Sequence, residues 1–397
     1  MMRLKLYGTD IPNAGSGETA ATVGTLATPA LLLDKDRLDR NLARLSSRMA
    51  ARGVVLRPHM KTAKSIEVAR RAYPSGSGPI TVSTLAEAEY FAQYGLRDMT
   101  YAVGLAQHTA ERAMRLRKVG IDLKMLLDSP EQATILGEAG RAAGVTPSAF
   151  IEIDCDGHRG GLTATDPRLF AVADALAEAG VKLAGILTHA GESYSLCTSE
   201  ALVEAAENER AVAVAAAEKL REAGYECPIV SVGSTPTAHF AENLTGVTEM
   251  RAGVYMFFDL VMHGVGVCTT DDIAVSVLAT VIGTKPEKGW ILIDAGWMAL
   301  SRDRGTAAQR ADQGYGLACD LSGKLYPDLI VSQASQEHGI LAIRSGSAEA
   351  LPDLPIGTKV RILPNHACAT ASQHELYNVV AAGSDAIEAQ WPRMRGW

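Results

Sequence analysis

The regular alternation of short apolar, strand-like runs with helix-like stretches constrains the fold of this chain more than any other feature. The runs lie at 54–60, 79–83, 99–103, 123–127, 150–155, 183–189, 229–233 and 248–252. Parallel strands need a crossover of about a dozen or more residues, usually a helix, and helix-like stretches separate nearly all of these runs. Eight such units over about 220 residues are typical of a (β/α)8 barrel. We therefore predict an α/β fold with a TIM barrel over residues 29–270.

The pattern changes after about residue 271. The runs that follow are short, rich in β-branched residues and separated by Gly, Pro and Asp turns, as in an all-β domain. A chain of 397 residues is also longer than one hydrophobic core usually covers. These features predict a smaller, mostly β domain over residues 271–397. We expect the polar segment 1–28 to pack on that domain.

Composition and charge exclude several classes of function. Hydrophobic residues make up 47% and charged residues 21% of the chain, as in ordinary soluble globular proteins. The net charge of −7 and the lack of a basic patch argue against a nucleic-acid or anionic-membrane partner. No apolar stretch reaches about 18 residues, and the N-terminus lacks a signal-like apolar run. Because the six cysteines also show no short paired spacing, we expect a cytoplasmic protein.

The sequence PHMKT at 58–62 closes the first predicted barrel strand and places Lys61 at its carboxyl end. In parallel α/β barrels this rim carries the active site, because its loops vary while the strands fix side-chain positions. A lysine amine can form a Schiff base with a carbonyl compound, and pyridoxal phosphate is the common protein-bound partner for that chemistry. The alternative interpretation is a solvated loop lysine. The motifs further along the chain favour the first interpretation.

Three further stretches accompany the lysine motif. They are EIDCDGHRGG at 152–161, GSTPT at 233–237 and PNHAC at 364–368. With these four motifs in this order, the chain from about residue 27 to its C-terminus resembles the D-serine dehydratase and D-threonine aldolase family. That family consists of fold-type III pyridoxal-phosphate enzymes related to alanine racemase. The resemblance implies a barrel followed by a β domain, and a homodimer whose active sites are completed across the interface.

The resemblance also assigns the cofactor residues. It makes Lys61 the residue that binds the aldehyde of pyridoxal phosphate, and a candidate for moving the α-proton of the substrate. It places Arg159 beside the phenolic oxygen of the cofactor. The other residues that it implies as cofactor contacts are His189, Tyr194, the phosphate turn Gly233, Ser234 and Thr235, the second phosphate segment Gly253 and Val254, and Arg251.

Two of these assignments carry further expectations. A Gly-rich turn after a late barrel strand can bind a phosphate with backbone N–H groups and a hydroxyl, which favours residues 233–235. Arg251 is similar to the arginine that faces the pyridine nitrogen in alanine racemases, where it would weaken the electron sink. The sequence leaves open whether Arg251 points into the barrel.

The pair His366 and Cys368 is the candidate metal site. Two residues apart on an extended segment, an imidazole and a thiolate project to the same side and can both reach one ion. The alternative is a packed histidine next to a buried thiol. In the setting of the family motif, the pair implies a divalent metal. The softness of the ligands favours zinc, with manganese or magnesium as alternatives.

The second metal ligand separates the two branches of the family. The aldolases carry aspartate there and the D-serine dehydratases carry cysteine, so Cys368 implies a lyase that dehydrates D-serine or another small 3-hydroxy-D-amino acid to a 2-oxo acid and ammonia. One alternative is a D-threonine or 3-hydroxy-D-aspartate aldolase, which gives glycine and an aldehyde. Another is a non-catalytic pyridoxal-phosphate-binding protein. The sequence leaves the β-substituent of the substrate open.

Three other stretches bear on the site. The sequence GIL at 185–187 departs from close relatives of the family, which often show a tyrosine before the histidine, so the substrate pocket can differ. Asp294 and residues 336–339 are family-like, and we expect them near the metal or at the mouth of a partner subunit's barrel. The alternative for Asp294 is a turn aspartate after a strand.

Overall fold

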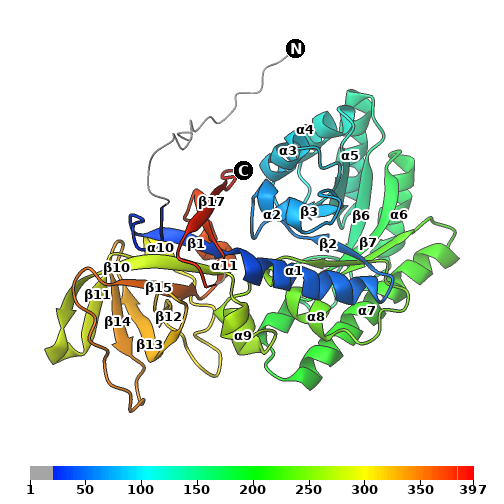
Figure 1. Ribbon diagram of the computed structural model, residues 1–397. Coiled ribbons are helices and arrows are strands. Elements are labelled where there is room, and N and C mark those ends of the chain that lie inside the picture. Colours follow the sequence, from blue (N-terminus) through cyan, green and yellow to red (C-terminus); the bar gives the residue numbers. More distant parts are fainter. Residues whose placement is uncertain (1–20, 382) are drawn as a thin grey trace.

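The computed structural model describes residues 21–381 and 383–397, and Figure 1 shows a barrel beside a second, antiparallel part. Within these residues, eight parallel strands form the barrel in the order β2-β9-β8-β7-β6-β5-β4-β3. The strands are β2 (Val55–Pro58), β3 (Ile80–Val82), β4 (Asp98–Gly104), β5 (Asp122–Leu127), β6 (Ser148–Ile153), β7 (Lys182–Thr188), β8 (Ile229–Val232) and β9 (Glu249–Ala252). The predicted barrel and its eight runs are confirmed.

The barrel closes between β2 and β3, the two ends of this strand order, through a short contact. His59 forms a parallel bridge with Thr81, and the N–H of Met60 donates a hydrogen bond of 2.8 Å to the Thr81 carbonyl. His59 and Met60 follow β2 directly, so the closure lies at the carboxyl rim. The turn that carries Lys61 therefore starts from a fixed point.

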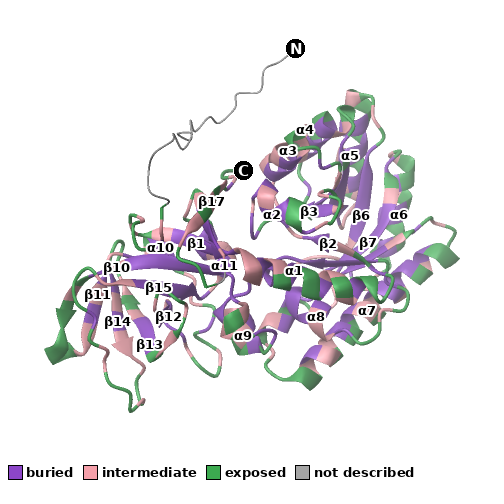
Figure 2. Cartoon of the chain, in the orientation of Figure 1, coloured by how far each residue is buried: buried purple, intermediate pink, exposed green. Residues whose placement is uncertain are grey.

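Helices surround the barrel, and their inner faces are buried while their outer faces are exposed (Figure 2). They are α2 (Ile66–Arg71), α3 (Leu85–Gln93), α4 (Gln107–Lys118), α5 (Pro130–Ala143), α6 (Arg168–Glu178), α7 (Ser199–Glu222) and α8 (Thr235–Phe240). Local sequence fixes several helix starts. Thr84 accepts a hydrogen bond from the N–H of Glu87 at the start of α3, and Ser129 does the same for α5.

Among the described residues, the other sheet has nine strands, in the order β11-β14-β13-β12-β15-β10-β1-β16-β17. They are β1 (Ala30–Asp34), β10 (Val275–Lys285), β11 (Trp290–Ile293), β12 (Gly316–Cys319), β13 (Leu325–Ala334), β14 (Gly339–Ile343), β15 (Lys359–Pro364), β16 (Leu376–Val380) and β17 (Ile387–Pro392). Because β10 also pairs with β11, the first six strands in this order, from β11 to β10, form a closed ring. The predicted β domain is confirmed.

The predicted boundary at residue 29 is corrected by strand β1. It pairs antiparallel with β10 and parallel with β16, so it belongs to the β domain although it precedes the barrel strands in the sequence. Leu31, Leu32 and Leu33 are all buried, and such a continuous apolar run fits a strand in either sheet. Helix α1 (Lys35–Ala50) then leads from the β domain to the barrel.

The segment before β1 also packs on the β domain where it is described. The N–H of Val23 donates to the Asp385 carbonyl at 2.7 Å, and Val23 packs with Leu32, Leu278 and Val380. The expectation for residues 1–20 lies outside the described residues. The remaining helices are α9 (Leu260–Val265), α10 (Trp297–Leu300), α11 (Ala367–Ala371) and the 3-10 turns η1 (Glu192–Ser195), η2 (Val254–Met256), η3 (Thr270–Asp272) and η4 (Pro286–Lys288). In the part of the chain that the structure describes, none of the helices combines the length and apolarity needed to cross a bilayer.

Candidate active site

Lys61 projects from a tight turn at the carboxyl end of β2. The N–H of Lys64 donates to the Met60 carbonyl at 2.7 Å and closes this turn. Met60, Thr62 and Ala63 are buried, whereas Lys61 is exposed. The fold thus anchors the backbone on both sides of Lys61 and leaves its amine accessible at the barrel rim.

The basic residues that the sequence assigned to the cofactor gather around this amine. Burial lowers the pKa of His59 well below its ordinary value, and the charges of Lys61, Arg251 and Arg159 lower it further. The same three charges help to hold the pKa of His189 at about 3, again after burial as the main cause. These side chains come from the ends of four different strands. The positive rim suits a cofactor with a phosphate and an ionised phenol.

His189 has a defined proton position. Its Nδ1 lies 3.1 Å from the Gly233 carbonyl, which can only accept, so Nδ1 carries the proton and Nε2 keeps its lone pair. The ring of Tyr194 lies 6.3 Å from that of His189, centroid to centroid. Burial raises the pKa of Tyr194, whose hydroxyl is hydrogen-bonded to Thr235. His189 and Tyr194 thus both connect the end of β7 to the turn after β8.

The turn after β8 differs in part from the prediction. Ser234 caps helix α8, since its N–H donates to Thr237 Oγ1 at 3.0 Å and its hydroxyl accepts from the Thr237 N–H at 3.2 Å. The N–H of Gly233 donates to Glu209 Oε1 at 2.8 Å. In the structure, protein acceptors use the backbone N–H groups that were expected to face a phosphate, and the assignment of Gly233 and Ser234 to the cofactor stays a prediction. Thr235 Oγ1 in turn accepts a hydrogen bond of 3.3 Å from the N–H of Tyr255 in the second segment, so the two predicted phosphate segments are in direct contact.

Gly253 in the second segment packs closely against the lysine turn. A Cβ atom at this position would lie 3.0 Å from Thr62 Oγ1 and 3.2 Å from the His59 carbonyl oxygen. A larger residue would push the lysine turn away from β9. The next residue, Val254, is buried at the start of η2. The glycine thus sets the distance between this segment and the turn of Lys61.

Glu209 on α7 is a site residue that sequence reasoning missed. Its buried carboxylate accepts hydrogen bonds from the N–H of Gly233 at 2.8 Å, the N–H of Ala190 at 3.0 Å and the Thr237 hydroxyl at 2.7 Å. Burial raises its pKa, and these three donors oppose the shift. Glu209 thereby ties the ends of β7 and β8 together. The available signal was its place, at helical spacing, in the buried stripe of Leu202, Ala206 and Ala213.

Replacing Glu209 with alanine is expected to destabilise the protein by about 3 to 5 kcal/mol, because three buried donors lose their acceptor. Chemical denaturation should show a lower midpoint. Glu207→Ala is the matched control, since Glu207 lies on the same helix and forms an exposed ion pair with Arg210. Equal midpoints for the two variants would contradict the role of Glu209.

Arg251 points into the barrel, which the sequence left open. Its Nη1 donates to Ser231 Oγ at 2.9 Å and its Nη2 to the Thr188 carbonyl at 2.5 Å. Ser231 in turn donates to Glu249 at 2.6 Å, and Glu249 accepts from Arg57 Nε at 2.6 Å. Burial lowers the pKa of Arg251, whereas Glu249 raises it. This network fixes the guanidinium at the bottom of the site.

His366 and Cys368 come together as predicted, although the backbone differs from the expectation. His366 is extended, but Cys368 already lies in helix α11, so the segment is not extended throughout. Asp259 causes the turn, because its carboxylate accepts hydrogen bonds of 2.9 Å from the N–H groups of Ala367 and Met262. The two side chains converge because the chain turns into the helix between them.

The donor set of this pair fits a metal ion. Asp303 Oδ2 lies 2.6 Å from His366 Nδ1, and a metal-binding histidine commonly donates its other ring N–H to a carboxylate. Burial opposes the charged imidazole, yet Cys368 and Asp303 raise the pKa of His366 to about 11. Burial would raise the pKa of the Cys368 thiol, but His366 and Lys61 lower it, which favours the thiolate that binds metals. Among the described residues, no group of three His, Cys, Asp or Glu side chains could hold an ion.

Asp303 was missed by the sequence analysis, and its role can be tested. Asp303→Asn is expected to weaken zinc binding by about 10- to 100-fold, because the His366 ring loses the carboxylate that orients it. Metal titration with a competing chelator measures the affinity. Asp312→Asn is the control, since Asp312 lies nearby in the chain and pairs with Arg304 instead. Unchanged affinity in Asp303→Asn would refute the assignment.

Asp294 and residues 336–339 were expected near the metal or at the mouth of a partner subunit's barrel, and their contacts within the chain are as follows. Asp294 Oδ1 accepts a hydrogen bond of 2.7 Å from the Thr280 N–H, and its Oδ2 accepts from the Thr28 hydroxyl. It is therefore a structural link between β11, β10 and the segment before β1. Residues 336–338 are exposed in the turn between β13 and β14.

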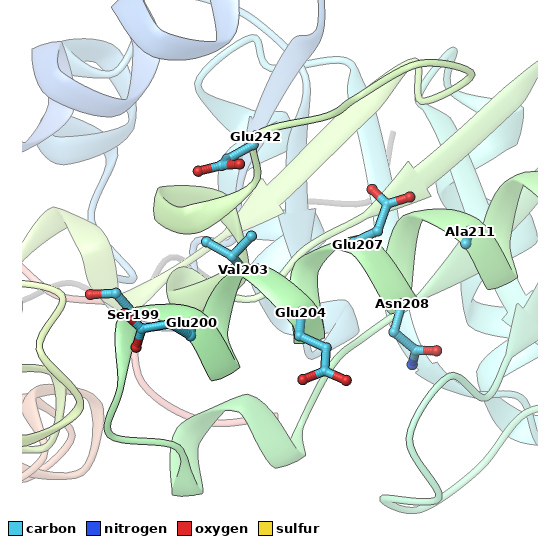
Figure 3. Close-up of a pocket in the computed structure, with 8 residues that line it drawn as sticks. All are labelled: Ser199, Glu200, Val203, Glu204, Glu207, Asn208, Ala211 and Glu242. Atoms are coloured by element: carbon cyan, nitrogen blue, oxygen red, sulfur yellow. The ribbon is translucent and has the colours of Figure 1, made fainter.

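A groove of about 630 Å³ runs along α7 (Figure 3). Its lining includes Glu200, Glu204, Glu207 and Glu242 around the apolar Val203. None of the predicted site residues lines it. Four carboxylates repel a phosphate or a carboxylate ligand, so the groove does not suit this chemistry.

Comparison with known proteins places the chain in a family. Residues 33–261 match the alanine racemase N-terminal domain, and residues 274–380 match the serine dehydratase domain. The chain is 54% identical to the D-threo-3-hydroxyaspartate dehydratase of Delftia sp. over 379 residues, which cover 95% of this chain and 99% of that protein. The chain belongs to the D-serine dehydratase and D-threonine aldolase family.

Members of this family are fold-type III pyridoxal-phosphate lyases, and the predicted family is confirmed. The D-serine dehydratase of Dictyostelium discoideum is 32% identical, over 93% of this chain and 97% of that protein. The solved structure of the Delftia dehydratase superposes with a TM-score of 0.91 at 53% identity, over 95% of this chain and 100% of that chain. Variants of that protein with a histidine or a cysteine replaced by alanine are also known, the cysteine variant in the metal-free form.

Proposed function

We propose that this chain is a pyridoxal-phosphate- and metal-dependent dehydratase of 3-hydroxy-D-amino acids, with D-threo-3-hydroxyaspartate and D-serine as candidate substrates. The products would be a 2-oxo acid and ammonia. The observation that carries the proposal is the pair His366 and Cys368, oriented by Asp303 and close enough to Lys61 for the lysine charge to lower the thiol pKa. The 54% identity to a dehydratase supports it.

Pyridoxal phosphate, when bound, supplies an electron sink for the electron pair left at the α-carbon of the substrate. Lys61 would hold the cofactor aldehyde before substrate arrives, and its amine, freed when the substrate amine takes its place, would accept the α-proton, because it is accessible in a fixed turn. Arg159 would lie beside the phenolic oxygen, and Arg251 toward the pyridine nitrogen. Thr235, Gly253 and Val254 would bind the phosphate, while His189 and Tyr194 would contact the ring. Gly233 and Ser234 would shape the phosphate turn.

The metal pair would act on the leaving group. Hydroxide departs poorly, and a Lewis acid held at the β-hydroxyl makes its departure easier. His366 and Cys368 would hold the ion, and their imidazole and thiolate favour zinc over manganese or magnesium. In the Delftia dehydratase, the histidine and the cysteine replaced in the two variants lie two positions apart, as these residues do here.

Cys368 also favours dehydration over the aldolase reaction. The family resemblance associates cysteine with dehydratases and aspartate with aldolases at this position. Aldolases among the relatives share 26% to 28% identity with this chain, well below the dehydratase of Delftia sp.. A protein that only binds pyridoxal phosphate would not need His366, Cys368 and Asp303 in this arrangement.

A product assay over a panel of 3-hydroxy-D-amino acids tests the proposal. The purified holoenzyme should release ammonia and a 2-oxo acid in equal amounts, without glycine. Glycine with an aldehyde would indicate the aldolase. No turnover of any member of the panel would favour a binding protein.

We further propose a cytoplasmic homodimer. All six cysteines are free thiols in the structure, which suits a reducing compartment. The family resemblance implies the dimer, with active sites completed across the interface. Light scattering and sedimentation of the holoenzyme would measure the assembly.

A further inference from the structure

The turn that carries Lys61 is fastened to the C-terminal end of the chain. The carbonyl of Ala63 accepts a hydrogen bond of 2.7 Å from Tyr377 Oη. The carbonyl of the next residue, Lys64, accepts one of 2.7 Å from the backbone N–H of Met394. Both donors lie more than 300 positions away in the sequence. The C-terminal strands thus reach the residues that directly follow the cofactor lysine.

Tyr377 is itself held in place. It is fully buried on β16, and its hydroxyl accepts a hydrogen bond of 3.2 Å from Arg393 Nε. Its ring meets that of Phe257 edge to face, with the centroids 5.5 Å apart. Burial raises the pKa of Tyr377 to about 12, so the phenol stays protonated and remains a donor. The hydroxyl that reaches Ala63 is therefore a fixed group.

The backbone at Lys64 needs such support. Lys64 has φ of +46°, in the left-handed region that residues other than glycine rarely adopt. Such a conformation persists only where surrounding contacts over-determine it. Its carbonyl is held by Met394 and its N–H by Met60. Its side chain adds an ion pair with Glu87, at 3.1 Å.

The C-terminal segment also lies against the outer helices of the barrel. Figure 1 shows β17 and the C-terminus beside α2, the helix that follows the lysine turn. The guanidinium of Arg71 on α2 stacks over the Trp391 ring, 5.0 Å from its centroid. Arg112 on α4 lies 3.4 Å from the Trp397 carbonyl oxygen. The segment therefore bridges the β domain and the barrel next to the active site.

We infer that Tyr377, Arg393 and Met394, here called the C-terminal clamp, are positioning residues that fix the turn of Lys61 and so direct its amine. The inference rests on the proposed function in one respect, since it takes Lys61 as the cofactor lysine. An amine that must both hold the cofactor and take a proton needs an accurate position, because displacements of about 1 Å are costly in catalysis. Residues near the C-terminus thereby position the lysine of the active site in the barrel.

The test compares Tyr377→Phe with Tyr73→Phe in the full chain. Tyr73 is a matched control, because its hydroxyl donates to the carbonyls of Leu56 and Pro79, away from the lysine turn. In cofactor-free protein, amide hydrogen exchange at residues 62–65 should be about tenfold faster in Tyr377→Phe than in the control. The dissociation constant for pyridoxal phosphate, measured by absorbance after dialysis, should rise by about tenfold only in Tyr377→Phe.

Met394→Pro is the second variant, and it decides the matter if Tyr377→Phe does not fold. It removes the backbone N–H that donates a hydrogen bond to the Lys64 carbonyl, and it should reproduce the faster exchange at residues 62–65. Exchange at these residues and cofactor affinity equal to those of Tyr73→Phe would overturn the inference. The exchange measurement needs no cofactor and no substrate. If the variants exchange faster at residues 62–65 but the parent protein has no dehydratase activity, the C-terminal clamp is supported and the proposed function is rejected.

Discussion

Lys61→Ala protein is expected to lack the visible absorption band of lysine-bound cofactor and to lose activity by about ten-thousandfold or more. The physical reason is that one amine serves two steps, cofactor attachment and transfer of the α-proton. The lysine turn is otherwise held by backbone bonds, so the variant should fold. Absorbance of the purified protein with added pyridoxal phosphate and a product assay measure the two effects.

Lys182→Ala is the control for this variant. Lys182 is an exposed lysine at the start of β7, on the opposite rim of the barrel. It should keep the absorption band and full activity. A Lys61→Ala protein with both properties would refute the assignment of the cofactor to Lys61.

Removal of the metal is expected to reduce ammonia release from 3-hydroxy-D-amino acids by about a hundredfold or more while the absorption band of the lysine-bound cofactor remains. Cofactor attachment uses Lys61, and the metal pair is a separate set of side chains. A Lewis acid contributes several kcal/mol to the departure of hydroxide, and each 1.4 kcal/mol is about tenfold in rate. Dialysis against a chelator, followed by readdition of zinc, measures the loss and its recovery.

A substrate with a better leaving group separates this role from a structural one. Turnover of a β-chloro analogue should depend much less on the metal, since chloride leaves without help. Cys368→Asp exchanges a soft ligand for a hard one and should shift the preference toward manganese. A fully active Cys368→Ala enzyme would show that this thiol is not a ligand.

The architecture could be predicted from the sequence because its signals are local and repeated. Each barrel strand is an apolar run followed by a helix, and the crossover requirement permits few alternatives. The sheet to which strand β1 belongs could not be predicted in this way. Its apolar run is compatible with both sheets, and only the partners β10 and β16, hundreds of residues away, decide where it lies.

The candidate site could be predicted where a motif carries it. Lys61, Arg159, His189 and Arg251 are brought to one rim, as their strand-end positions suggested. The supporting residues could not be predicted, because their function lies in long-range contacts. Asp303 meets His366 from 63 positions away, and no local pattern marks it.

The hydrogen-bond partners of the turn at residues 233–235 could not be predicted for a different reason. A Gly-Ser-Thr sequence after a barrel strand is compatible with N–H groups that face a ligand or with a helix cap. The structure has the cap at Ser234, and the N–H of Gly233 is used by Glu209. Which acceptor an N–H finds depends on the side chain that packs above it, and that side chain comes from α7.

The products that the holoenzyme forms from D-threo-3-hydroxyaspartate, before and after metal removal, decide whether the chain is a metal-dependent dehydratase. We expect a 2-oxo acid and ammonia in equal amounts with zinc, and loss of both after chelation while the cofactor band persists. Formation of glycine and an aldehyde, or undiminished ammonia release after exhaustive metal removal, would contradict this expectation.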